Sequence, residues 1–320
     1  VAIANSLPLS RAAWEARQGA SRLLAGQERY GEALAQLGAL SGQGRPPERR
    51  RLRQRLDRLL PRAMEAARAE GKPFQAFKQY NRYGGDRPPA EAGRQAFHSL
   101  LALGALKAAR RTLVQYRDTF GETIQDKRWE YQLAQGYREA GDSAGLAFID
   151  NLLGRDGTHP WAKQLRLERA RLLKRTGRHE RLLAYLDAHP GLPAGEALPM
   201  RAHAHEALGR PAKAYQVLAR WDRRSQPQPL PGPVYAEAGD LAARSGQVYD
   251  ARDYWRKALE AGVPDWQARQ LRVLLGVDAL QREDFAGVEK YLTQVKGDGA
   301  FARAAETYNA LVPLIREKVD

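Results

Sequence analysis

Apolar residues recur along most of the chain at the spacing of amphipathic helices, and turns centred on glycine divide these helices into pairs. In each pair a helical stretch ends at the turn and a second amphipathic helix follows. Successive turn residues lie 32 to 37 residues apart in the clearest units, which are centred on Gly104, Gly141, Gly177, Gly209 and Gly246. No stretch shows the alternation of a half-buried strand, so the pattern predicts an all-α protein with almost no strand.

Weaker units fit the same frame around Gly26, Gly71 and Glu283, and a last helix is predicted over residues 301–319. A single hairpin cannot cover both of its apolar faces, so each must pack on its neighbours. We expect adjacent backbones to approach closely at small residues, namely Ala202, Gly239, Ala251 and Gly276. We expect the gaps between helices to be filled by larger residues, namely Leu182, Leu186, Leu218, Trp255 and Leu292.

Three stretches rich in Pro, Gly and charge interrupt the helical pattern and predict long loops: Ser41–Arg50, Asn81–Gly93 and Asp222–Val234. With these loops as boundaries, the chain divides into four parts. The predicted parts are irregular hairpins over 1–90, central repeats over 91–221, a Pro-rich loop over 222–233, and further repeats with a capping helix over 234–320.

The composition favours partners of negative charge and excludes several kinds of site chemistry. The 320 residues include 52 Lys and Arg against 37 Asp and Glu, a net charge of +15, which favours anionic partners. Cysteine is absent, which excludes disulfides, thiolate catalysis and cysteine-ligated zinc, and which fits either a reducing or an oxidising compartment. No apolar run is long enough to span a bilayer. The first residues lack an initiating Met and the layout of a signal peptide, so we expect a piece of a longer protein.

One short motif suggests catalysis, and its context argues against that interpretation. Gly141–Gly145 spells G-x-S-x-G around Ser143, the pattern of a serine-hydrolase nucleophile elbow, but that elbow needs a strand entering the turn. A helix enters here, so we predict an interhelical turn. His203 and His205 are the only close histidine pair, and residues two apart on a helix point in different directions. Gly71-Lys72 lacks the rest of a phosphate-binding loop. We therefore predict no catalytic residue, cofactor or metal, and no enzyme.

The paired helices resemble the tetratricopeptide repeat (TPR) family. In the unit around Gly246, the family's core positions are occupied by Tyr235, Ala238, Gly239, Ala251, Trp255 and Ala258, and around Gly141 by Leu133, Ala134 and Tyr137. The resemblance implies a right-handed α-solenoid of about eight TPR-like helical hairpins with a C-terminal capping helix. It also implies that the first helix of each hairpin lines a concave groove.

Mapped onto this chain, the groove becomes apolar near Val273 and Val277, and its middle is basic and partly aromatic. The implied partner-binding residues are Arg68, Arg94, His98, Tyr131, Gln135, Arg138, Gln164, Arg171, Lys174 and His203, with Glu206 beside them. Such a surface suits an extended acidic or carboxylate-bearing segment, because Arg forms bidentate hydrogen bonds with carboxylates.

These features favour a non-catalytic scaffold that binds a partner protein or peptide. The Arg- and Ala-rich, irregular repeats resemble the periplasmic TPR regions of bacterial outer-membrane exopolysaccharide secretion proteins of the cellulose, poly-N-acetylglucosamine and Pel kinds. That resemblance implies docking of polymer-modifying enzymes, transient contact with polysaccharide, and a periplasmic location, with the cytoplasm as the alternative. Two other functions stay open: a basic α-solenoid that binds nucleic acid, and the helical portion of a murein-processing enzyme.

Overall fold

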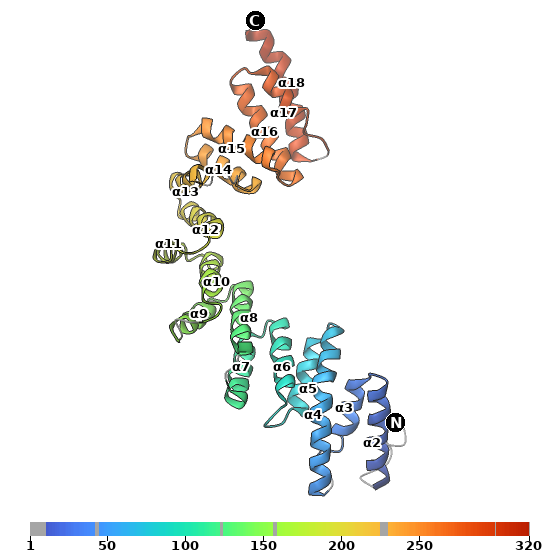
Figure 1. Cartoon of the computed structure of the whole chain (residues 1–320). Coiled ribbons are helices and arrows are strands. Elements are labelled where there is room, and N and C mark those ends of the chain that lie inside the picture. Colours follow the sequence, from blue (N-terminus) through green and yellow to red (C-terminus); the bar gives the residue numbers. More distant parts are fainter. Residues whose placement is uncertain are drawn as a thin grey trace. The chain divides into compact units, whose positions relative to one another are not determined.

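A computed structural model of the chain describes residues 11–41, 45–121, 124–155, 159–224, 230–297 and 299–319. Within these residues the regular structure is entirely α-helical (Figure 1). The chain forms two compact units, residues 1–176 and 177–320. None of the helices in the described ranges is both long enough and apolar enough to cross a membrane.

The first unit contains nine helices within its described residues. They are α2 (Arg11–Gly26), α3 (Tyr30–Gly38), α4 (Pro46–Ala69), α5 (Pro73–Tyr83), α6 (Ala90–Ala102), α7 (Leu106–Phe120), α8 (Ile124–Ala140), α9 (Ala144–Arg155) and α10 (Ala162–Arg175). Each helix packs on the next along the chain, and α4 also contacts α6 as α8 contacts α10. The hairpins therefore stack in chain order, and the first helices α4 and α6, and likewise α8 and α10, lie side by side.

The second unit continues the pattern with eight helices in the described residues. They are α11 (His179–Ala188), α12 (Ala194–Ala207), α13 (Pro211–Arg224), α14 (Gly232–Arg244), α15 (Val248–Ala261), α16 (Asp265–Gln281), α17 (Phe285–Leu292) and α18 (Ala300–Val319). The last helix, α18, packs against both α16 and α17, as the predicted capping helix should. The predicted class of stacked TPR-like hairpins is confirmed, and the predicted domain boundaries stay predictions.

The turns explain the spacing of the glycines. At the predicted turn positions from Gly71 to Gly246 the backbone is left-handed, with φ between 65° and 76°. At two turns a glutamate takes this conformation: Glu28 has φ 59° and Glu283 has φ 58°. The prediction of Gly26 as the first turn residue was therefore wrong, because Gly26 is the last residue of α2.

The predicted loops are shorter than expected. Helix α4 begins at Pro46, so the prediction of a loop to Arg50 was wrong. Proline suits the first position of a helix because its missing N–H needs no partner there. The loop after α5 is likewise confined to residues 84–89. Of the third predicted loop, residues 225–229 lie outside the described residues, while α13 and α14 occupy its ends.

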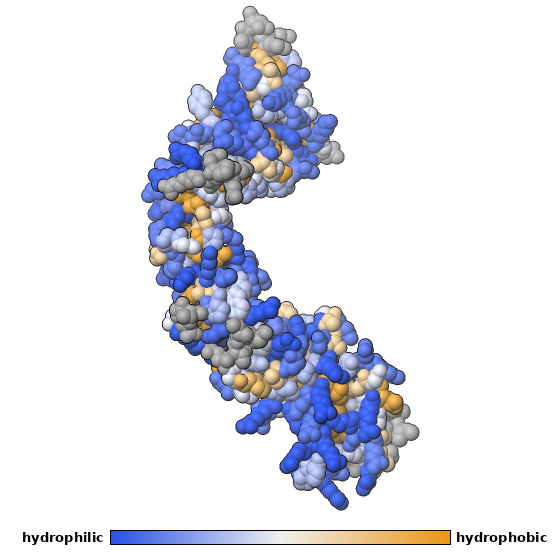
Figure 2. Space-filling view, in the orientation of Figure 1, coloured by the Kyte–Doolittle hydropathy of each residue, from blue (hydrophilic) through white to orange (hydrophobic). Residues whose placement is uncertain are grey.

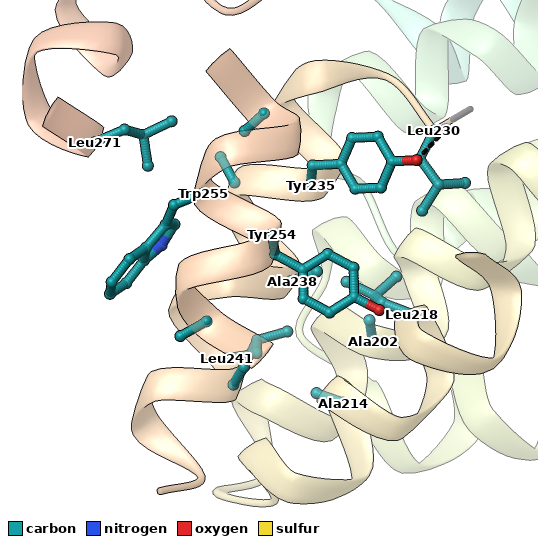
Figure 3. Packing of buried hydrophobic residues seen from close by; sticks show 14 of the residues in the cluster. Ala202, Ala214, Leu218, Leu230, Tyr235, Ala238, Leu241, Tyr254, Trp255 and Leu271 are labelled. Atoms are coloured by element: carbon teal, nitrogen blue, oxygen red, sulfur yellow. Dashed lines mark hydrogen bonds between the residues drawn. The ribbon is translucent and has the colours of Figure 1, made fainter. Parts of the chain in front are cut away.

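Buried side chains fill the space between the helices of the second unit, among them the predicted residues Ala202, Leu218 and Trp255 (Figure 3). At the predicted small residues the helices approach closely: a Cβ atom on Gly239 would lie 2.6 Å from Nε1 of Trp255 and 3.1 Å from the carbonyl oxygen of Ala251. One on Gly276 would lie 2.6 Å from Cγ of Leu292. The five predicted gap-filling residues are all buried, as are Ala202 and Ala251. The expected alternation of small and large residues between helices is confirmed.

Candidate functional site on the first helices

Nine of the ten predicted partner-binding residues lie on the first helices of hairpins in the first unit. Arg68 belongs to α4, and Arg94 and His98 belong to α6. Helix α8 carries Tyr131, Gln135 and Arg138, and α10 carries Gln164, Arg171 and Lys174. We call these nine side chains the first-helix face. His203 lies on α12 in the second unit, so its placement is described separately.

At one end of the first-helix face, a chain of hydrogen bonds joins α4 to α6. Arg68 Nη1 donates to Gln95 Oε1 at 2.5 Å, and Gln95 Nε2 donates to Glu91 Oε1 at 2.9 Å. Arg94 Nε donates to the same carboxylate oxygen at 3.1 Å. Glu91 and Gln95 were not predicted as site residues, yet they hold the two predicted arginines in place.

His98 lies in the middle of a positively charged region. Its ring packs edge-on against the rings of Phe97 and Trp129, with centroids 5.4 and 6.0 Å away. Burial, and then the positive charges of Arg68, Arg94 and Arg128, together lower its pKa from 6.5 to about 4. His98 is therefore neutral near pH 7, and the cationic character of this region comes from arginines on three helices.

A titration checks this electrostatic picture. We expect the His98 imidazole resonances to stay at their neutral positions down to about pH 5, because the pKa is about 4. Replacing Arg94 by Gln removes one repelling charge and should raise the pKa of His98. The pKa of His98 in the folded chain lies below the value of 6.5 for an unperturbed histidine, so the unfolded chain takes up a proton more readily. The contribution of neutral His98 to the free energy of unfolding is therefore fully present above pH 6.5 and is lost as the pH falls from 6.5 towards 4. An NMR midpoint near 6.5 in the native chain would contradict the assignment.

At the other end of the face, a buried carboxylate joins α8 to α10. The Glu168 side chain is 1% exposed and lies 2.7 Å from Arg138 Nε and 2.9 Å from Arg171 Nη1. Beside it, Gln135 Nε2 donates to the Tyr131 hydroxyl at 3.2 Å. Burial, and then the nearby Glu168 charge, raise the pKa of Tyr131. The structure therefore brings Tyr131, Gln135, Arg138 and Arg171 into one cluster around a glutamate that sequence reasoning missed.

The remaining predicted residues are less tightly held. Gln164 is exposed and Lys174 is half-buried on α10. In the second unit, the His203 ring packs against His179 with centroids 5.6 Å apart, and Glu206 forms an ion pair with Arg244 on α14. Their role in partner binding stays a prediction, as it does for the first-helix face.

The residues of the serine motif form a turn. Ser143 lies between α8 and α9, and Asp142 Oδ1 accepts a hydrogen bond from the Ala144 N–H at 2.9 Å. The predicted interhelical turn is confirmed. Among the residues that the structure describes, no cluster of His, Cys, Asp or Glu could hold a metal ion.

The stacked helices and the first-helix face together define an all-α repeat protein built from helical hairpins. No family model and no curated protein matches the chain. Among solved structures, it is similar to a tetratricopeptide repeat protein from Parabacteroides merdae, at 17% identity over 81% of this chain and 96% of that chain, with a TM-score of 0.36. It is also similar to pilF of Pseudomonas aeruginosa, at 16% identity over 69% of this chain and 96% of that one, with a TM-score of 0.45.

A third similar structure is the TPR domain of P58(IPK), at 16% identity over 80% of this chain and 76% of that chain, with a TM-score of 0.29. At these identities and TM-scores the likenesses carry no functional argument. The chain's own helices, turns and packing establish the fold.

Proposed function

We propose that the chain is a non-catalytic scaffold that binds an extended segment of a partner protein along the first-helix face. The observation that carries this proposal is the run of polar, mainly basic side chains from α4 through α6 and α8 to α10. Packed helices have axes about 8–10 Å apart, a distance that about three residues of extended chain cover. An extended segment can therefore meet the first helices α4, α6, α8 and α10 in turn.

The charges of this face favour a partner segment with carboxylates. Arg68, Arg94 and Arg128 surround His98, with Glu91 as the nearby acid that pairs with Arg94. Glu168 forms ion pairs with both Arg138 and Arg171, so it holds the two guanidinium groups in fixed positions. Arg has five N–H donors, and those not directed at Glu168 can donate to a second carboxylate.

We further infer the process and the compartment in which this scaffold acts. The process is the assembly or secretion of a bacterial exopolysaccharide at the cell envelope, and the compartment is the periplasm. The support is the likeness of the Arg- and Ala-rich repeats to the TPR regions of such secretion proteins, together with a sequence free of cysteine. The partner would be a polymer-modifying enzyme, and contact with the polysaccharide would be transient.

A double substitution on the first-helix face tests the proposal. In the source bacterium, Tyr131→Ala with Gln135→Ala should reduce co-isolation of the partner and polymer export, because central tyrosines often contribute about 2 kcal/mol to binding. That loss corresponds to an affinity about thirtyfold weaker. The matched control is Lys107→Ala with Gln115→Ala, two exposed residues on the second helix α7. Equal co-isolation from both variants, at equal protein levels, would refute the proposal.

A further inference from the structure

Helix α4 carries a row of arginines that lies outside the predicted partner-binding residues. Arg51, Arg55, Arg58 and Arg62 follow one another at intervals of four, three and four residues, so they form one stripe along the helix. Leucines on the other side of α4 pack into the core. With a rise of 1.5 Å per residue, the arginine row is about 16 Å long, with steps of about 6, 4.5 and 6 Å.

The arginine row is accessible, and its charges form no ion pairs with the acidic side chains that the structure describes. Arg51, Arg58 and Arg62 are exposed, and Arg55 is half-buried, with Nη1 donating to Gln18 Oε1 at 2.9 Å. Burial lowers the pKa of Arg55, and the charge of Arg22 on α2 lowers it further. Among the described residues, none of the four forms an ion pair with Asp or Glu. The surface where α4 lies in Figure 1 is hydrophilic in Figure 2.

This arrangement costs stability in the free protein. Like charges three or four residues apart on a helix repel one another. On α4 the nearby acid Asp57 pairs with Arg53, which is not in the row, at 2.8 Å. Arg62 lies 5.9 Å from the centre of the Tyr30 ring, which orients its guanidinium group without neutralising it. An anionic ligand along the row would relieve the repulsion.

We propose that the arginine row binds an acidic segment of the partner in an extended conformation, with carboxylates at every second residue. Side chains two residues apart on an extended chain point to the same side and are about 6.6–6.8 Å apart. That repeat is close to the two steps of about 6 Å and longer than the step of about 4.5 Å, and about five residues, with three carboxylates, span the row. This inference rests on the proposed function and names the chemistry of the bound segment.

A single-stranded nucleic acid is the competing ligand, and the surroundings of the row favour the peptide. Proteins that bind single strands stack bases on aromatic side chains. Within the described residues of α4, no large hydrophobic or aromatic side chain is exposed; in sequence, the nearest exposed ones are Leu23 and Phe74. Apart from the half-buried ring of Tyr30 beside Arg62, the row therefore offers charge and hydrogen-bond donors without a stacking surface.

The test is a fluorescence anisotropy titration of the whole chain with a labelled twelve-residue peptide of alternating Glu and Ser. We expect saturable binding in low salt that Arg51→Glu with Arg58→Glu weakens more than about tenfold, a loss of about 1.4 kcal/mol or more. Arg51→Gln with Arg58→Gln should weaken it less, because it removes charge without repulsion. The control Lys107→Glu with Arg111→Glu makes the same charge change at exposed positions on α7 and should shift the Kd less than about threefold.

Two outcomes would overturn the inference. One is equal loss of binding in the α4 and α7 variants, which would mean that only net charge matters. The other is tighter binding of a twelve-nucleotide oligothymidylate than of the peptide, lost in the α4 variant. If either occurs while the Tyr131 and Gln135 variant still loses its partner, the proposed function stands without the arginine row. If that variant keeps its partner, the proposed function itself fails.

Discussion

Replacing Gly239 by Leu is expected to destabilise the second unit by about 2–3 kcal/mol. A Cβ atom at this position would already lie 2.6 Å from Nε1 of Trp255, and the Ala251 carbonyl oxygen blocks a shift towards α15. Trp255 is itself fixed, because its Nε1 donates to Asp240 Oδ1 at 2.9 Å. The added side chain must therefore force α14 and α15 apart.

Urea unfolding followed by circular dichroism measures this effect. The matched control is Gly195→Leu, a helical glycine on α12 with nothing within 4 Å of an added Cβ. It should be neutral or slightly stabilising, because leucine favours a helix over glycine by almost 1 kcal/mol. If Gly239→Leu unfolds at the same urea concentration as the native chain, the close packing of α14 on α15 is incorrect.

Local sequence signals predicted most of the fold, because the physical cause of each turn is local. A left-handed residue ends a helix, and glycine adopts that conformation with little strain, so the turns at Gly104 and Gly246 could be located from the letters alone. Glu28 shows the limit, because a left-handed glutamate has no local sequence signature; Glu283 was located by the repeat frame and not by its residue type. The start of α4 was missed because its prolines and arginines are also typical of loops.

The candidate site was harder to predict from the sequence than the fold was. Helical periodicity placed Tyr131, Arg138 and Arg171 on first helices, but it could not reveal that Glu168 bridges two helices, because that contact depends on how α10 packs on α8. The arginine row was visible in the letters from Arg49 to Arg62. The predicted loop ended at Arg50, so the helix start at Pro46, and the continuous stripe of arginines that follows from it, were not predicted.

The first-helix face is the centre of the account, and photo-crosslinking in the source cell tests it most directly. Gln164 on α10 and Lys107 on α7 are both exposed positions in the first unit, one on a first helix and the other on a second helix. A photoreactive amino acid at position 164 is predicted to give a discrete crosslinked protein, because that side chain faces the bound segment. The same probe at position 107 should give none. Crosslinking from position 107 with none from position 164 would contradict the account.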